Sequence, residues 1–169
     1  MTPQELLLDA FGRVRDGVAD LVTGMTAEDL AWRPGPKANS VAWLVWHLTR
    51  IQDDHVAGVA GTDQVWTTGG WHEKLALPFD PRDTGYGHDA DQVATVRPAS
   101  GRLLADYHDA VHAQTVRFLG SPEAADLDRV VDTRWDPPVT LAVRLVSVIG
   151  DDMAHLGQAQ YVRGLHAAQ

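Results

Sequence analysis

Hydrophobic residues recur at helical spacing in four separate stretches of the chain. The first stretch opens with Thr2, Pro3 and Glu5, where threonine caps a helix, proline fills its first position and glutamate completes a capping box. Apolar residues then follow at intervals of three and four as far as Gly24, where the pattern stops. We therefore expect an amphipathic helix between Pro3 and about Gly24.

The same spacing predicts three further helices. They cover about 40–59, after a cap at Asn39 or Ser40, about 100–119, and about 139–163. Residues 61–97 hold several glycines and prolines and few periodic apolar positions, so they predict a long irregular loop. The alternation typical of strands is almost absent. The pattern therefore predicts an all-α fold, a four-helix bundle formed by a single domain over residues 1–169.

Three polar side chains interrupt the apolar faces of the second and fourth predicted helices. His47 lies within about 60° of Leu44 and Ile51 on a helical projection, so it is expected inside the bundle. Asp151 and His155 are four residues apart and project from one helix face, with about 5–6 Å between their Cβ atoms. A divalent cation shared with two imidazoles would remove the cost of burying the carboxylate. We interpret His47, Asp151 and His155 as metal ligands.

Other interpretations of these polar residues stay open. Asp152 also pairs with His155, at a spacing of three, but it lies about 100° round from Asp151, so Asp151 is preferred. The simpler alternative is a structural hydrogen bond between aspartate and histidine in a polar layer of the core. His108 and His112 form another pair spaced by four, but they point away from the apolar stripe of their helix. We expect these two on a solvated face.

Composition excludes several classes of function. The chain has no cysteine, which removes disulfides, cysteine nucleophiles and thiolate metal sites. The formal net charge of −9, only two lysines and scattered arginines argue against a nucleic-acid partner. Neither a glycine-rich phosphate loop nor the glutamates of a ferritin-like di-iron site are present. No signal peptide or membrane span is recognisable, so we expect a cytoplasmic protein without a membrane partner.

Two histidines and one carboxylate leave at least one coordination position open, as in catalytic zinc sites. An open position can bind water and lower its pKa to about 7. It can equally hold an incoming thiol as a thiolate. Because the chain has no thiol of its own, a sulfur nucleophile would have to arrive as a cosubstrate.

Three segments of the chain carry a family resemblance: MTAEDLAWRPGPKANSVAWLVWHLTRIQDDH, PFDPRDTGYGH and VIGDDMAHLGQAQYVRG. They resemble the DinB superfamily of four-helix metal-binding proteins, particularly the actinobacterial branch related to mycothiol-dependent S-transferases and mycothiol-dependent maleylpyruvate isomerase. The resemblance covers almost the whole chain. It implies a metal triad in which family histidines match His47 and His155. The middle ligand, a histidine or a glutamate in family members, falls here on Asp151.

The resemblance implies a metal-dependent S-transferase of detoxification. A divalent metal, zinc by expectation, would hold mycothiol as a thiolate that is conjugated to a small electrophile. The alternatives are a metal-dependent hydrolase using metal-bound water and a non-catalytic bundle that binds a small ligand. A homodimer is a family-level expectation, and the 61–97 loop could cover the site or form the dimer contact.

Two further residues are expected to bind the cosubstrate. Trp43 lies about 40° from His47 on the helical projection and could line the mouth of the site. Arg144 lies two turns before Asp151 and about 20° round, where it could pair with an anionic substrate or with Asp151 itself. An arginine that extends along the bundle end into solvent is the competing interpretation.

Overall fold

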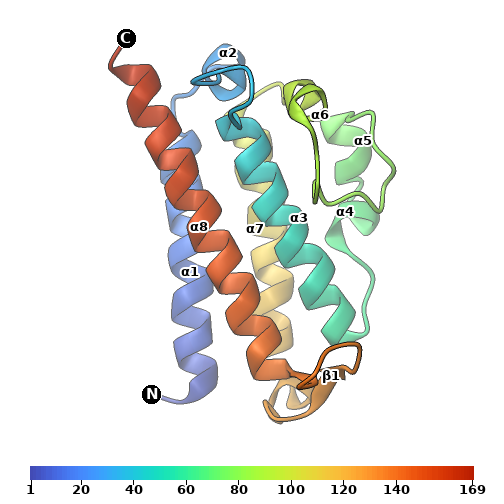
Figure 1. The fold of residues 1–169 in the computed structure, drawn as a ribbon. Helices are drawn as coiled ribbons and strands as arrows, with labels where there is room; N and C mark the ends of the chain where they lie inside the picture. The colour runs from blue at the N-terminus through green and yellow to red at the C-terminus, as the bar shows by residue number, and fades with distance from the viewer.

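The computed structural model describes all 169 residues, and four long helices dominate it (Figure 1). They are α1 (Pro3–Val22), α3 (Val41–Ala60), α7 (Gly101–Leu119) and α8 (Leu141–Ala167). All four predicted helices and the all-α bundle are thereby confirmed. The fourth begins two residues later than predicted, because Val139–Thr140 form the short strand β2, and it continues four residues beyond Arg163.

Side-chain caps fix where each long helix begins. Thr2 and Glu5 form the predicted capping box of α1. Ser40, rather than Asn39, caps α3 by accepting a hydrogen bond from the Trp43 amide. Ser100 and Thr140 cap α7 and α8 in the same way. The start points of the helices therefore follow directly from local hydroxyl side chains.

The remaining elements are short and lie in the connections. They are α2 (Ala27–Ala31), α4 (Val65–Thr68), α5 (Trp71–Leu75), α6 (Ala90–Thr95), the 3-10 helix η1 (Pro122–Ala124) and the antiparallel strands β1 (Val130–Asp132) and β2 (Val139–Thr140). The prediction of a structureless 61–97 loop is thus wrong in part, because α4, α5 and α6 form within it. No helix is both long enough and apolar enough to span a membrane.

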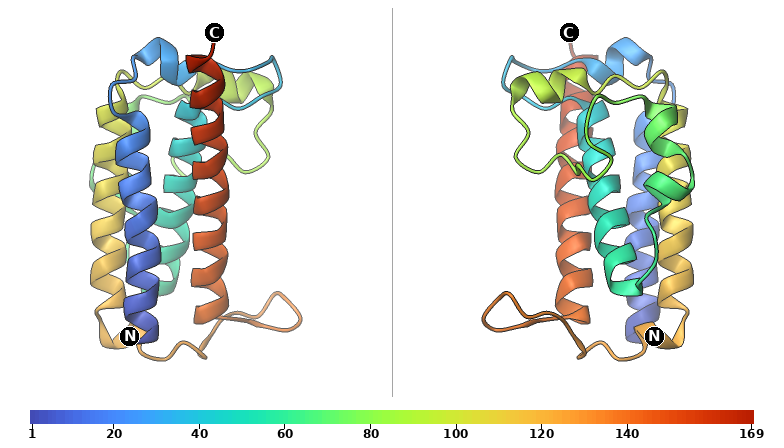
Figure 2. Two further views of the ribbon diagram at one scale, coloured as in Figure 1. Left: turned by 90° about the vertical axis from the view of Figure 1, so that its left-hand side faces the viewer. Right: turned by 90° about the vertical axis from the view of Figure 1, so that its right-hand side faces the viewer.

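The long 61–97 connection lets α3 and α7 run in the same direction, opposite to α1 and α8 (Figures 1 and 2). Each of α3 and α8 packs mainly against the other, and α1 packs mainly against α7. Because α3 is covered by α8, by α7 and by the 61–97 connection, residues 40–50 are buried without interruption. A helix in that position presents no solvated face over this length.

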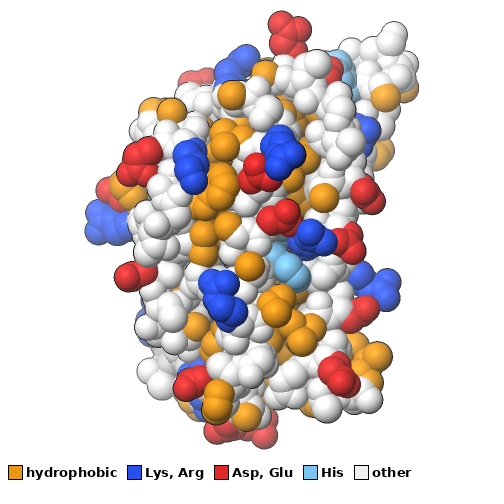
Figure 3. All heavy atoms as spheres, turned by 180° about the vertical axis from the view of Figure 1, so that it is seen from behind, with side chains coloured by type: hydrophobic (Ala, Val, Ile, Leu, Met, Phe, Trp, Pro, Cys, Tyr) orange, Lys and Arg blue, Asp and Glu red, His pale blue; other side chains and the backbone are white.

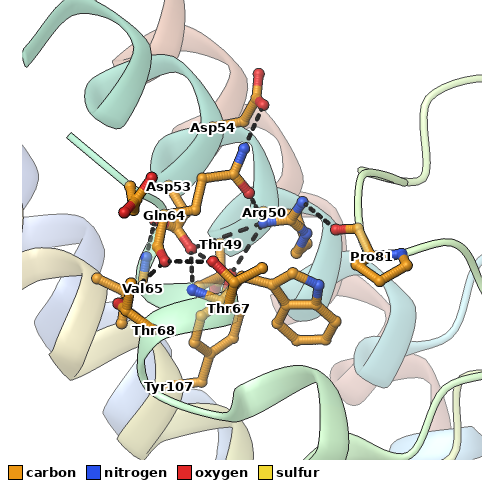
Figure 4. A network of polar contacts seen from close by, with 12 residues as sticks. Thr49, Arg50, Asp53, Asp54, Gln64, Val65, Thr67, Thr68, Pro81 and Tyr107 are labelled. Atoms are coloured by element: carbon orange, nitrogen blue, oxygen red, sulfur yellow. Dashed lines mark hydrogen bonds and ion pairs between the residues drawn. The ribbon is translucent and has the colours of Figure 1, made fainter. Parts of the chain in front are cut away.

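A buried ion pair on α3 anchors the start of the 61–97 connection (Figure 4). Arg50 and Asp53 lie 3.7 Å apart and are almost inaccessible to solvent. The Asp53 carboxylate accepts hydrogen bonds from the amides of Val65 and Trp66, at 2.9 and 2.7 Å, and from the Tyr107 hydroxyl at 2.9 Å. The carboxylate thereby satisfies the first amides of α4 and ties the connection to both α3 and α7.

The same ion pair anchors the far part of the connection. The Arg50 guanidinium donates to the carbonyl of Asp83 at 3.1 Å and to that of Pro81 at 3.3 Å. It also donates to the Gln64 side-chain oxygen at 2.8 Å. A charge removed from water in this way is tolerated only when its donors are all occupied. Arg50 therefore fixes residues 81–83 against α3.

Charges are mixed on the rear of the bundle. Seen from behind, Lys and Arg side chains alternate with Asp and Glu side chains and do not gather by sign (Figure 3). Exposed opposite charges also pair on the surface, as Arg15 does with Asp109 at 2.8 Å and Arg13 with Asp9 at 2.6 Å. Exposed pairs of this kind contribute little to stability, but they leave no broad basic patch on this face.

His108 lies in the core, so the prediction of a solvated face is wrong for it. It is 1% exposed, and its Nδ1 lies 3.0 Å from the hydroxyl of Thr49. That hydroxyl donates to the Val45 carbonyl at 2.7 Å, so His108 Nδ1 is the donor to Thr49. Because α7 packs against both α1 and α3, its buried arc is wider than its apolar stripe. His112, one turn on, is half-buried.

The burial of His108 predicts a specific pH dependence of stability. Burial lowers the pKa of His108 to about 3, whereas a histidine in the unfolded chain has a pKa of about 6.5. Between these values the unfolded chain binds a proton that the folded chain does not, so folding stability falls as the pH falls. Relative to a His108→Gln variant, the wild type should lose about 1.4 kcal/mol per pH unit between pH 6 and 4. Urea unfolding at each pH measures the difference, and parallel pH profiles for the two proteins would contradict it.

Candidate metal centre

The structure brings His47, Asp151 and His155 together where α3 and α8 face each other. One potential ligand atom from each residue lies within 4.8 Å of those from the other two. The imidazole rings of His47 and His155 meet edge to face, with centroids 4.8 Å apart. His155 Nε2 lies 3.6 Å from Asp151 Oδ1. The aspartate is therefore long enough to join the two histidines, although it is one methylene shorter than a glutamate.

Hydrogen bonds at Nδ1 orient both imidazoles. His47 Nδ1 donates to the carbonyl of Thr84 at 2.6 Å, and His155 Nδ1 lies 3.1 Å from the Gln158 side-chain oxygen. A carbonyl oxygen can only accept, so the proton of His47 lies on Nδ1 and the lone pair lies on Nε2. An outer partner of this kind fixes tautomer and ring orientation in metal-binding histidines. Both rings are thus arranged to ligate through Nε2.

The electrostatics of the three residues suit a cation. Burial lowers the pKa of His47 below its ordinary value, so its imidazole is neutral and able to ligate near neutral pH. Asp151 Oδ2 is buried without any hydrogen-bond partner, which would be costly for an isolated carboxylate. A divalent cation would supply the missing partner. The three residues therefore fit a metal ion, and the set of two nitrogens and one oxygen is one that zinc accepts.

The site is open on one side. The side chains of His155 and Asp151 are 18% and 35% exposed, whereas His47 is 5% exposed. His47 thus forms the inner wall, and the two residues of α8 form the solvent-facing edge. Three protein ligands with a solvent-facing edge leave room for a small molecule at the same ion.

Trp43 supports His47 instead of facing solvent. Its ring stacks on the His47 imidazole, with centroids 4.6 Å apart and planes 12° apart, and it meets the His155 ring edge-on at 6.2 Å. Only 6% of Trp43 is exposed. The predicted place beside the site is correct, but the contact is with the ligand rings rather than with the opening.

Arg144 does not pair with Asp151, so that prediction is wrong. Its guanidinium donates to Asp132 of β1 at 3.0 Å, and its other terminal nitrogen lies 3.3 Å from His55 Nδ1. Asp132 follows an irregular connection, and nothing in the periodicity of α8 could place it there. The side chain of Arg144 is 18% exposed, so it does not extend into solvent either.

Asp152 is fully buried, in contrast to its expected place at the edge of the apolar stripe. Both of its carboxylate oxygens lack a partner, and burial raises its pKa well above the ordinary value, which favours the protonated form. Leu145, Val148 and Leu156 share its buried face, which is rotated relative to the predicted one. The rotation arises because α8 packs against α1 as well as α3. Asp151 consequently lies at the boundary of this face.

Sequence reasoning missed the 83–88 segment, which holds His47 from outside the helix. The Asp83 carboxylate accepts a hydrogen bond from the Gly85 amide at 2.7 Å and lies 3.0 Å from His88 Nε2. His88 Nδ1 in turn accepts from the Trp43 indole at 3.1 Å. These bonds close the segment on itself and fasten it to α3. Thr84 is thereby held where its carbonyl meets His47.

Gly85 is the one feature of this segment that the sequence could have revealed as a contact with the site. The Gly-x-Gly pattern of residues 85–87 is too short for a phosphate loop and has a different cause. The φ of Gly85 is +89°, and a Cβ there would lie 2.8 Å from the Trp46 ring and 2.9 Å from His47 Nδ1. The positive φ and the close approach both require glycine. A glycine at this position therefore marks where the connection touches the ligand.

Comparisons with known proteins agree with the fold. A family model described as "Mycothiol-S-transferase" matches residues 6–168. None of the curated proteins compared with the chain matches it significantly. Among solved structures, the crystal structure of a conserved protein from Enterococcus faecalis is similar, with 33% sequence identity and a TM-score of 0.91. The match covers 100% of this chain and 99% of that one.

Replacement of Gly85 should weaken metal binding without removing a ligand. In Gly85→Ala the new methyl group must displace His47 or the Trp46 ring next to it, so zinc affinity should fall about tenfold or more. Competition with a chromophoric chelator measures the affinity. Gly87→Ala is the matched control, because Gly87 also has a positive φ, +79°, but nothing lies within 4 Å of its Cβ position. Equal affinities for the two variants would contradict the role of the contact.

Proposed function

Because the chain belongs to the mycothiol-S-transferase family, we propose that it conjugates mycothiol, through its sulfur, to a small electrophile at the His47–Asp151–His155 site. The observation that carries this proposal is a three-ligand site with an open side in a chain without cysteine. A protein with no sulfur nucleophile of its own can still run thiol chemistry when a cosubstrate brings the thiol.

A divalent cation in this site, zinc in our proposal, would supply a Lewis acid that keeps a thiol deprotonated near neutral pH. His47 and His155 contribute neutral nitrogen donors. Asp151 contributes one negative charge, so the loaded site keeps a net charge of about +1. That residual charge favours an anionic sulfur over water or a neutral thiol.

The residues around the triad position the reactants. Thr84 and Trp43 hold the His47 ring still, one by a hydrogen bond and one by stacking. The exposed edge formed by Asp151 and His155 is where both the thiol and the electrophile would approach. In the transfer the thiol proton leaves to solvent, sulfur forms a bond to the electrophilic carbon, and the leaving group departs with its electron pair. The protein holds the sulfur and excludes water from the His47 side.

The activity test uses zinc-loaded protein, purified mycothiol and an alkyl bromide that becomes fluorescent when its carbon is bonded to sulfur. Thiol-dependent turnover is expected above the spontaneous rate. In His47→Ala turnover should fall by more than about 100-fold, since loss of a ligand exceeds the 10–100-fold cost of losing a supporting contact. His112→Ala, a half-buried histidine on α7, should retain the activity of the wild type.

Two results of this assay would overturn the proposal. Turnover that needs the metal but not the thiol, with cleavage of an ester or amide, would replace the transferase by a hydrolase using metal-activated water. Absence of any turnover above background by fully metal-loaded protein, across alkyl, aryl and epoxide electrophiles, would leave a bundle that binds small ligands without catalysis.

A further inference from the structure

A cavity lies between the two helices that carry the candidate metal centre, nearer the β1–β2 end of the bundle. Its volume is about 330 Å³, and its polar lining comes from Asp54 and His55 of α3, Asp132 and Arg134 of the β1–β2 region, and Arg144 of α8. We name it the Arg144 pocket. None of these five side chains belongs to the triad, and the proposed transfer gives none of them a role.

The Arg144 pocket is displaced from the triad along the bundle axis. On α3, His55 follows His47 by eight residues, and on α8, Arg144 precedes Asp151 by seven. A helix rises about 1.5 Å per residue, so the two sites are about 10–12 Å apart. The two sites remain within electrostatic reach of each other. Burial and the Arg144 charge lower the pKa of His55, and the Asp151 carboxylate of the triad opposes part of this shift.

The polar groups of the pocket are held in fixed positions. Arg144 donates to the Asp132 carboxylate at 3.0 Å and to His55 Nδ1 at 3.3 Å. Arg134 donates to the same carboxylate through two nitrogens, at 3.0 and 2.8 Å. His55 Nδ1 also lies 3.4 Å from Asp54 Oδ2, and a neutral imidazole offers one donor and one acceptor nitrogen. The pocket thus presents both hydrogen-bond donors and hydrogen-bond acceptors.

The charges of the pocket cancel. Two arginines face two carboxylates, those of Asp54 and Asp132, and burial keeps His55 neutral. An anion would find both guanidiniums already engaged with Asp132. A hydroxyl group both donates and accepts, so a neutral ligand with several hydroxyls matches this lining best. The predicted role of Arg144 in holding an anionic substrate is therefore not the one that its contacts favour.

Mycothiol has the dimensions to reach both sites. It joins a cysteinyl group through an amide to glucosamine, which is linked to the polyol inositol. About eight bonds separate the sulfur from the inositol ring, and an extended chain advances about 1.2 Å per bond, which gives about 10 Å. The separation of the two sites corresponds to this length.

We propose that the Arg144 pocket binds the polyhydroxyl end of the thiol cosubstrate while the triad holds its sulfur end, so that the pocket selects which thiol is used. This inference rests on the proposed function. It assigns specificity to Arg144, Asp132 and His55, and it leaves the reaction at the triad unchanged.

The test is calorimetric binding to zinc-loaded protein with three probes: mycothiol, N-acetylcysteine, and N-acetylglucosaminyl-inositol, which lacks the cysteinyl group and carries no charge. Mycothiol should bind at least about tenfold more tightly than N-acetylcysteine, since several hydrogen bonds are added. The thiol-free probe should bind to zinc-loaded and metal-free protein alike. This last readout does not depend on the metal or on turnover.

Single-residue variants distinguish the contribution of the Arg144 pocket to binding from that of the triad. Arg144→Met should remove most of the difference in affinity between mycothiol and N-acetylcysteine, and it should abolish binding of the thiol-free probe. Its affinity for N-acetylcysteine should fall less than about threefold. Arg134→Gln changes an arginine that is 84% exposed, so it should fold normally, and it should reduce mycothiol affinity by about threefold. Arg117→Met, an exposed arginine of α7, is the matched control and should change nothing.

The possible failures are distinguishable. If mycothiol and N-acetylcysteine bind the wild type equally and the thiol-free probe does not bind, the pocket assignment is wrong and the proposed function stands. If neither thiol binds the zinc-loaded protein but the thiol-free probe does, the proposed function fails and the pocket assignment stands. If none of the three binds, both are wrong.

Discussion

The candidate metal centre depends on one hydrogen bond, from His47 Nδ1 to the carbonyl of Thr84. It places the proton on Nδ1 and leaves the Nε2 lone pair for the ion. A backbone carbonyl can occupy that position only if the 61–97 connection is held against α3. The buried Arg50–Asp53 pair does this through backbone groups at both ends of the connection. The buried Arg50–Asp53 pair thus orients the metal-ligating His47 indirectly, by holding the segment that contains Thr84.

The four long helices, the caps of the first two and the convergence of the triad could be predicted because they depend on local spacing. The 3.6-residue period reports which positions share a face, and a spacing of four brings Asp151 and His155 together. The 61–97 connection could not be predicted in this way. Its short helices are stabilised by α3 residues far away in sequence, such as Asp53, and no local pattern in 61–97 reveals a partner on another helix.

Two incorrect predictions, those for His108 and Asp152, share one physical origin, which is that a helix with several neighbours has more than one buried face. His108 and Asp152 both lie outside the apolar stripe of their helices, yet packing against a second helix buries them. Arg144 has its partner on β1, an element too short to be predicted. Polar residues on such secondary faces are therefore the ones that periodicity assigns wrongly to solvent.

Metal analysis of the wild type beside Asp151→Asn and Asp152→Asn tests the central claim most directly. We expect about one zinc ion per chain in the wild type and in Asp152→Asn, since Asp152 is fully buried and does not join the His47–Asp151–His155 cluster. Asp151→Asn should lose most of its zinc while keeping its helical content. Retention of zinc by Asp151→Asn, or its loss from Asp152→Asn alone, would contradict the assignment of the triad.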